Sequence, residues 1–148
     1  MTGWWESGVL LVHAGVTLGM VGVIWTCQVV HYPLFALVGA GEFAAYHREH
    51  CRRIAPLVGV MMPIELACAG WLAWSAEDDS RTLAYAGLAL AVSIWLVTAG
   101  VQARQHGRLS MGKDDRVIRA LVAGNWLRTA VWTARGVIAL AMLRGPGA

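Results

Sequence analysis

Charged residues are scarce in this chain of 148 residues. They make up 14% of the sequence, against roughly 25% in an average soluble domain, while hydrophobic residues make up 57%. Long apolar stretches take up most of the chain, and the short connections between them leave no room for a separate water-exposed domain. Any chemistry that the protein performs must therefore take place within or against the apolar stretches.

Several motifs of soluble enzymes are also missing. The sequence has no glycine-rich phosphate loop, no Walker motif and no serine-nucleophile elbow, which argues against nucleotide-driven and hydrolytic functions. The three cysteines, Cys27, Cys51 and Cys68, show no paired spacing, and we assign them neither a disulfide nor a zinc site. No Lys or Arg precedes the first apolar stretch, and that stretch is too long for a signal peptide, so we expect it to be retained.

Four apolar stretches are long enough to cross a membrane as helices. A hydrocarbon core about 30 Å thick needs about 20 apolar residues of helix. We therefore predict an all-α protein, a single integral membrane domain over residues 1–148 that forms a four-transmembrane-helix bundle. The predicted spans are Ser7 to Val30, Ile54 to Trp74, Leu83 to Val101 and Val117 to Leu143.

Basic residues concentrate in two of the three predicted connections. The second connection has Arg81 beside three acidic residues, whereas the first and third are strongly basic. Because basic loops stay in the cytoplasm, we predict that both termini lie outside, in the periplasm, and that the protein resides in a bacterial cytoplasmic (inner) membrane. Contact of these loops with anionic lipid headgroups accounts for the basic pI, so we expect membrane lipids and no nucleic acid as partners. The basic residues are Arg48, Arg52, Arg53, Arg104, Arg108, Lys113, Arg116 and Arg119.

Each predicted helix carries polar residues at helical spacing. Lipid tolerates such residues poorly, which favours turning all four polar faces into the bundle. The polar residues are His13, Thr17, Gln28 and His31 in the first helix, Glu65 in the second, Thr98, Gln102 and His106 in the third, and Asn125, Arg128 and Arg135 in the fourth.

The helical rise sorts these residues into three layers. His13 and Arg135 form an outer layer, Glu65 pairs with Arg128 at mid-membrane, and a cytoplasmic layer is rich in histidine and amide side chains. Because Glu65 neutralises one arginine, Arg135 either extends to the outer interface or holds an anionic ligand.

Four histidines are predicted to lie at one depth near the cytoplasmic side. His47 and His50 are three residues apart and share a face if their segment is helical. With His31 and His106 they provide enough imidazole nitrogens to bind Zn, Fe or Cu. The alternative is an interfacial turn whose histidines contact water and headgroups. Haem and the absence of any cofactor also stay open.

Glycine and proline add two expectations. Gly15, Gly19 and Gly22 form a small-residue pattern that lets helices approach closely, either inside the bundle or between two copies of the chain. Pro33 is expected to end the first helix.

Three segments resemble a group of small bacterial four-helix membrane proteins. That group is similar in topology to anthrone-oxygenase-like membrane proteins and, more distantly, to the small membrane protoporphyrinogen oxidase. The resemblance implies an oxidoreductase or oxygenase, but it identifies no particular catalytic residue, because the spacing between histidine and proline differs here. The segments are Trp25-Thr-Cys-Gln28-Val-Val-His31-Tyr32-Pro33-Leu-Phe35, His47-x-x-His50-x-Arg52-Arg53-Ile54 and Asn125-Trp126-Leu-Arg128-Thr129-x-x-Trp132-x-x-Arg135.

Three functional hypotheses follow. The first is a membrane oxidoreductase or oxygenase that takes an apolar small molecule laterally from the lipid. In this hypothesis Glu65 and His31 transfer protons, and Arg128 and Arg135 hold substrate oxygens. The second is a module that binds a cofactor or metal, or handles protons, through a continuous wet path. The third is a structural subunit of a membrane complex. Candidate cofactor-binding residues are Arg135, His13, Gln28, Gln102 and Asn125.

Overall fold

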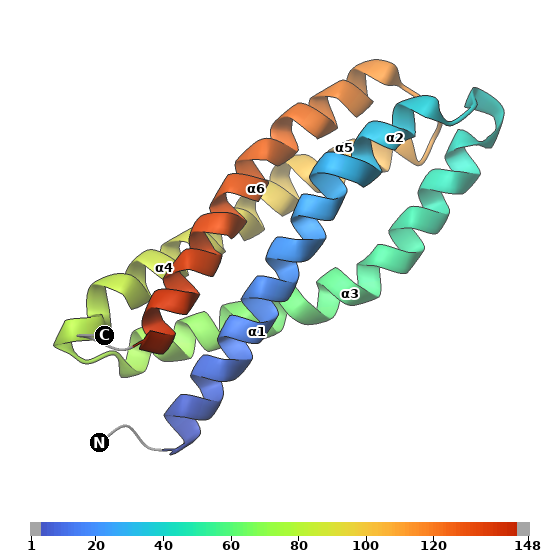
Figure 1. Ribbon diagram of the computed structural model, residues 1–148. Coiled ribbons are helices and arrows are strands. Elements are labelled where there is room, and N and C mark those ends of the chain that lie inside the picture. The colour runs from blue at the N-terminus through green and yellow to red at the C-terminus, as the bar shows by residue number, and fades with distance from the viewer. Residues whose placement is uncertain (1–3, 145–148) are drawn as a thin grey trace.

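The computed structural model describes residues 4–144, which fold into four long helical segments with no strand among them (Figure 1). The predicted all-α class is confirmed. Helices α1 (Trp4–Thr26) and α2 (Tyr32–Leu34) form the first segment, α3 (Ala40–Ser75) the second, α4 (Asp78–Val97) with α5 (Ala103–Leu109) the third, and α6 (Asp115–Arg144) the fourth.

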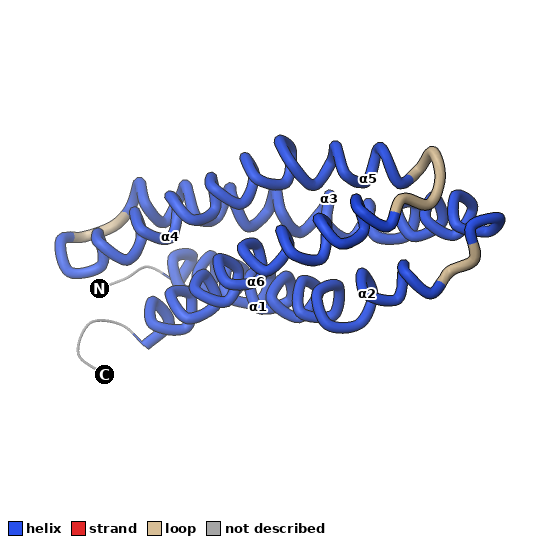
Figure 2. The backbone as a smooth tube through the Cα atoms, turned by 90° about the horizontal axis from the view of Figure 1, so that it is seen from above, coloured by secondary structure: helices blue, strands red, loops and turns tan. Residues whose placement is uncertain are grey.

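The four segments run antiparallel and pack side by side in a ring. Helix α1 packs against α3 and α6, and α4 packs against the same two helices from the other side. Figure 2 shows the connections gathered at the two ends of the bundle. The end with both termini and the α3–α4 connection is called the terminal end. The opposite end, where α2 leads to α3 and α5 leads to α6, is called the histidine end.

Three segments are long and apolar enough to cross a membrane, namely Ser7–Leu37, Ala40–Ser75 and Asp78–Leu109. The length and composition of these three support the prediction of an integral membrane protein. Helix α6 has the length but does not qualify, because polar and charged side chains interrupt its apolar sequence. The fourth predicted span is therefore a helix of the bundle, but its composition is not that of a membrane-spanning helix.

The helical segments are longer than predicted, including the third, which spans Asp78–Leu109. Helix α3 begins at Ala40 after Gly39, so the segment with His47 and His50 is helical and not a loop. Its inward residues Phe43, His47 and His50 recur at helical spacing and are buried, which stabilises these extra turns. Nor does Pro33 end the first segment. The chain widens into a π-helical turn at Cys27–His31 and continues helically to Leu37.

Two hydrogen-bonded caps close the histidine end. The Asp114 side chain accepts the backbone N–H groups of Arg116 and Val117 at 2.9 and 3.1 Å, which caps the start of α6. The ammonium of Lys113 donates to the carbonyl oxygens of Ala36 and Val38, both at 2.8 Å. The lysine therefore fastens the α5–α6 connection to the end of the first segment.

An apolar layer crosses the middle of the bundle. Met20, Ile24, Met62, Ile94 and Trp132 are all buried there. In the first segment this layer separates Thr17 from Gln28, and in α6 Trp132 stands between the two arginines. This apolar layer interrupts the continuous water-filled path that a proton-conducting protein would need.

The glycines of α1 divide between two roles. A Cβ on Gly19 would lie 2.5 Å from the Met61 side chain, so this glycine permits close approach of α1 to α3 inside the bundle. Gly15 and Gly22 face open space. Association of two copies through this face stays a prediction.

Candidate functional site

Near the terminal end, the buried side chains of His13, Glu65 and Arg135 form one cluster, the terminal-side cluster. Arg135 donates from Nη2 to the Glu65 carboxylate and to His13 Nε2, the latter at 2.7 Å. A Cβ on Gly87 would come within 2.5 Å of Arg135 Nη1, so that glycine makes room for the guanidinium. The partner of Glu65 is therefore Arg135, and the predicted pairing with Arg128 is wrong.

This cluster is balanced in charge. Because a guanidinium can only donate, His13 Nε2 accepts the hydrogen bond and the imidazole is neutral. The carboxylate of Glu65 then cancels the charge of Arg135. An anionic ligand at Arg135, one of the two sequence-based alternatives, is not required for neutrality.

On the other side of the apolar layer, a network of amides surrounds Arg128. Asn125 Nδ2 donates to Gln28 Oε1 at 2.9 Å, and Gln28 Nε2 donates to the Val122 carbonyl at 3.2 Å. Arg128 Nη1 donates to Asn125 Oδ1 at 3.0 Å, and its Nε has no partner. Every group in this network is uncharged except Arg128, which is 6% exposed.

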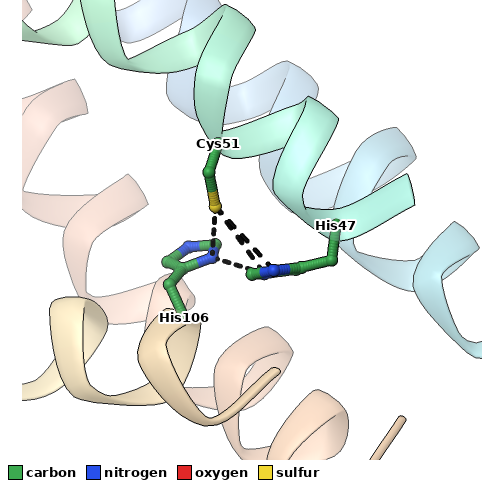
Figure 3. A group of neighbouring side chains, drawn as sticks. All are labelled: His47, Cys51 and His106. Carbon is green, nitrogen blue, oxygen red and sulfur yellow. Dashed lines mark hydrogen bonds between the residues drawn. The ribbon is translucent and has the colours of Figure 1, made fainter. Parts of the chain in front are cut away.

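Figure 3 shows the feature that sequence reasoning missed, a triangle of His47, Cys51 and His106. We call it the metal-ligand triangle. His47 Nε2 lies 3.0 Å from His106 Nδ1, and Cys51 Sγ lies 3.9 Å from each of these nitrogens. These are the kinds of atoms that bind transition metals, and all lie within 4.8 Å of one another. His47 and Cys51 come from successive turns of α3, and His106 comes from α5.

The other two predicted ligands lie beside the triangle. The rings of His31 and His50 are tilted by 32° with centroids 4.5 Å apart, and the His50 ring lies 5.7 Å from that of His106. The Nε2 atoms of His31 and His50 have no hydrogen-bond partner among the described residues. All four predicted histidines thus meet at the histidine end, but the compact set of ligand atoms consists of two of them and Cys51.

Two π-helical turns supply residues of this region. Cys27–His31 carries Gln28 and His31, and Thr98–Gln102 carries Gln102 one turn before His106. Gln102 is 2% exposed, and neither its amide oxygen nor its nitrogen has a partner. Single π-helical turns within α-helices often occur at functional sites, and here two of them lie at the same end of the bundle.

A pocket of about 470 Å³ opens between α1 and α3 next to the histidines. Most of its lining is apolar, including Val23, Ile54 and Leu57, while His31 and His50 form part of its wall. Its volume falls in the usual range for small-molecule sites, about 300 to 1,000 Å³. The pocket is thus positioned to bring an apolar molecule close to the imidazoles.

Comparison of the chain with protein-family models, with curated proteins and with solved structures finds no match. The function of the protein must therefore be inferred from the side chains of the histidine end and from the family resemblance, which stays an expectation.

Proposed function

We propose that this protein is an integral membrane metalloprotein that binds a transition-metal ion between His47, Cys51 and His106. The observation that carries the proposal is the spacing of their ligand atoms. A point in the plane of the three atoms lies about 2.1 Å from each, which is close to the usual metal–nitrogen and metal–sulfur bond lengths of about 2.0 and 2.3 Å.

Hydrogen bonds from outside the triangle support the same conclusion. Ser110 Oγ donates to the His106 carbonyl at 2.9 Å, so it accepts from His47 Nδ1 at 3.2 Å. That tautomer leaves a lone pair on His47 Nε2, the nitrogen that lies 3.0 Å from His106 Nδ1 and 3.9 Å from Cys51 Sγ. Metal-binding histidines are usually oriented by such a bond from their other ring nitrogen.

His106 has a corresponding partner in Tyr32. The Tyr32 hydroxyl lies 3.3 Å from His106 Nε2 and can donate to it or accept from it. When Tyr32 donates, His106 Nδ1–H donates to His47 Nε2 across 3.0 Å. A metal ion would take the place of that proton between the two nitrogens, and His106 Nε2–H would then donate to the Tyr32 hydroxyl.

The first experiment is elemental analysis of the protein purified in mild detergent, with an absorption spectrum of the same sample. We expect stoichiometric transition metal in the wild type and its loss in Cys51→Ser. Cys68→Ser is the matched control, because Cys68 is on the same helix but outside the triangle. The proposal fails if folded wild-type protein retains no metal and takes up neither added Cu(I), Zn(II) nor Fe(II). A Soret band would instead indicate haem.

Oxidoreductase activity on an apolar substrate is a second candidate, favoured by the pocket between α1 and α3 and by the family resemblance. We use a short-chain hydroquinone as the probe. The hydroquinone would lose two electrons and two protons to become a quinone. Dioxygen would accept the two electrons and the two protons and form hydrogen peroxide. Gly22→Leu is designed to fill the pocket, because a side chain at Gly22 points into open space there.

The expected result is loss of hydroquinone-dependent oxygen uptake in Gly22→Leu with its metal content retained. Gly15→Leu is the control, since Gly15 also faces open space but does not line the pocket. Equal oxygen uptake by wild type and Gly22→Leu would exclude the pocket as the substrate site. An absence of uptake with bound metal would leave a metal-binding protein that does not oxidise this probe.

The proposal also includes an orientation. We place α6 across the membrane, because its charged residues Arg128 and Arg135 are buried in the bundle and not turned to lipid. The basic residues at the histidine end favour a cytoplasmic location for that end, with both termini outside, in the inner membrane of a bacterium. In intact cells, an impermeant maleimide should label Ser75→Cys and spare Met111→Cys. The opposite labelling would reverse the orientation.

A further inference from the structure

The chain carries a buried positive charge on the same side of the apolar layer as the metal-ligand triangle. Arg128 donates to Asn125, which donates to Gln28 in the first segment. Gln28 lies one turn before Tyr32, whose hydroxyl lies 3.3 Å from His106 Nε2. Among the described residues Glu65 is the only buried acidic side chain, and it pairs with Arg135. The charge of Arg128 is therefore not neutralised by any carboxylate that the structure describes there.

That charge affects mono- and divalent metal ions differently. A cysteine binds metal as the thiolate and loses its proton, whereas the two imidazoles bind in the neutral form. Binding of a monovalent ion with loss of the Cys51 proton leaves the charge of the site unchanged. Binding of a divalent ion with the same proton loss raises it by one, next to a cation in a medium of low dielectric constant.

The set of ligand atoms favours the same kind of ion. The triangle offers one thiolate and two imidazoles, and His50 lies outside the set of close ligand atoms. Soft thiolate ligands favour Cu(I), and trigonal His₂Cys sites are typical of copper. Structural Zn(II), by contrast, almost always has four ligands in a tetrahedron.

We infer that the metal-ligand triangle is a Cu(I) site and that Arg128 disfavours divalent ions at it. This inference rests on the proposed function, because it names the metal of the same site. Arg128 acts here as a specificity-determining residue through its charge and does not ligate the metal.

The test compares the effects of Arg128 on two metals. Dissociation constants are measured under anaerobic, reducing conditions by competition with a Cu(I) chelator and, separately, a Zn(II) chelator. In Arg128→Met we expect Zn(II) binding to tighten by about tenfold and Cu(I) binding to change less than about twofold, because only the divalent complex carries the added charge. Arg53→Gln is the control, an exposed arginine of the same end that pairs with Glu49.

A second variant tests the charge without removing the arginine. Asn125→Asp places a carboxylate against Arg128, since Asn125 Oδ1 already accepts from Arg128 Nη1 at 3.0 Å. It should tighten Zn(II) binding in the same direction as Arg128→Met. Equal changes for both metals, or unchanged Zn(II) binding in both folded variants, would overturn the inference while leaving a metal site. Failure of the wild type to bind either metal would overturn the proposed function and this inference together.

Discussion

The terminal-side cluster and the histidine end both bury ionisable groups, but they differ in how the buried positive charge is neutralised. At the terminal-side cluster the charges of Glu65 and Arg135 cancel, and His13 accepts a hydrogen bond from the same guanidinium. At the histidine end no carboxylate among the described residues pairs with Arg128. In the described part of the chain, unpartnered nitrogens occur in both regions, on His13 and Arg135 as well as on His31 and His50.

The difference separates a structural role from a binding role. A charge-neutral cluster needs no counter-ion from outside the chain, so its contribution is to hold α1, α3 and α6 in register, although His13 Nδ1 and Arg135 Nε find no partner among the described residues. The histidine end combines a charge without a described counter-charge with three converging ligand atoms, which is why we propose a ligand there. Burial of a charged residue is therefore weak evidence for function unless its partners are counted.

The largest expected effect is a loss of stability when the charge balance of the terminal-side cluster is removed. Glu65→Gln leaves Arg135 buried without its counter-charge and should cost about 3 to 5 kcal/mol of stability. Arg128→Met removes a cation that has no counter-charge and should change stability by less than about 1 kcal/mol. Thermal unfolding in detergent measures both. The double variant Glu65→Gln with Arg135→Met should recover most of the loss, and a failure to recover would mean that the pair is needed for more than charge balance.

Much of the fold could be predicted from the sequence. Apolar length and helical periodicity predict the four helices and the inward faces that carry His13, Glu65 and Arg128, all of which are buried. These signals are local, because they depend on the spacing of residues within one helix.

The pairing of residues between helices was harder to predict from the sequence. Arg128 and Arg135 are two turns apart, about 10 Å along the helix, so a modest error in the relative depth of α3 and α6 is enough to assign Glu65 to the wrong arginine. The triangle also depends on packing between α3 and α5. The i, i+4 spacing of His47 and Cys51 was visible, but only the fold shows that His106 completes the set.

A medium effect distinguishes the packing of the two regions. In Gly87→Ala the new methyl group meets the Arg135 guanidinium at 2.5 Å, which should cost about 1 to 3 kcal/mol. The matched variant Gly124→Ala meets only the Gln102 amide, at 4.0 Å, and should be neutral or slightly stabilising because alanine favours helix. Thermal unfolding of the two variants provides the measurement. Equal destabilisation would show that the histidine end is packed as tightly as the terminal-side cluster.

The smallest expected effect is a change in metal affinity at the histidine end. Ser110→Ala removes the hydroxyl that orients His47, and it should weaken metal binding by about tenfold, the lower end of the usual range for such partners. Ser93→Ala is the control, because Ser93 also donates to a carbonyl of its own helix, at 2.7 Å, but lies away from the triangle. Metal competition should separate the two variants, whereas their unfolding temperatures without metal should be similar. If both variants bind metal like the wild type, Ser110 serves only the end of α5, and the histidine end resembles the terminal-side cluster more than its unpaired groups indicate.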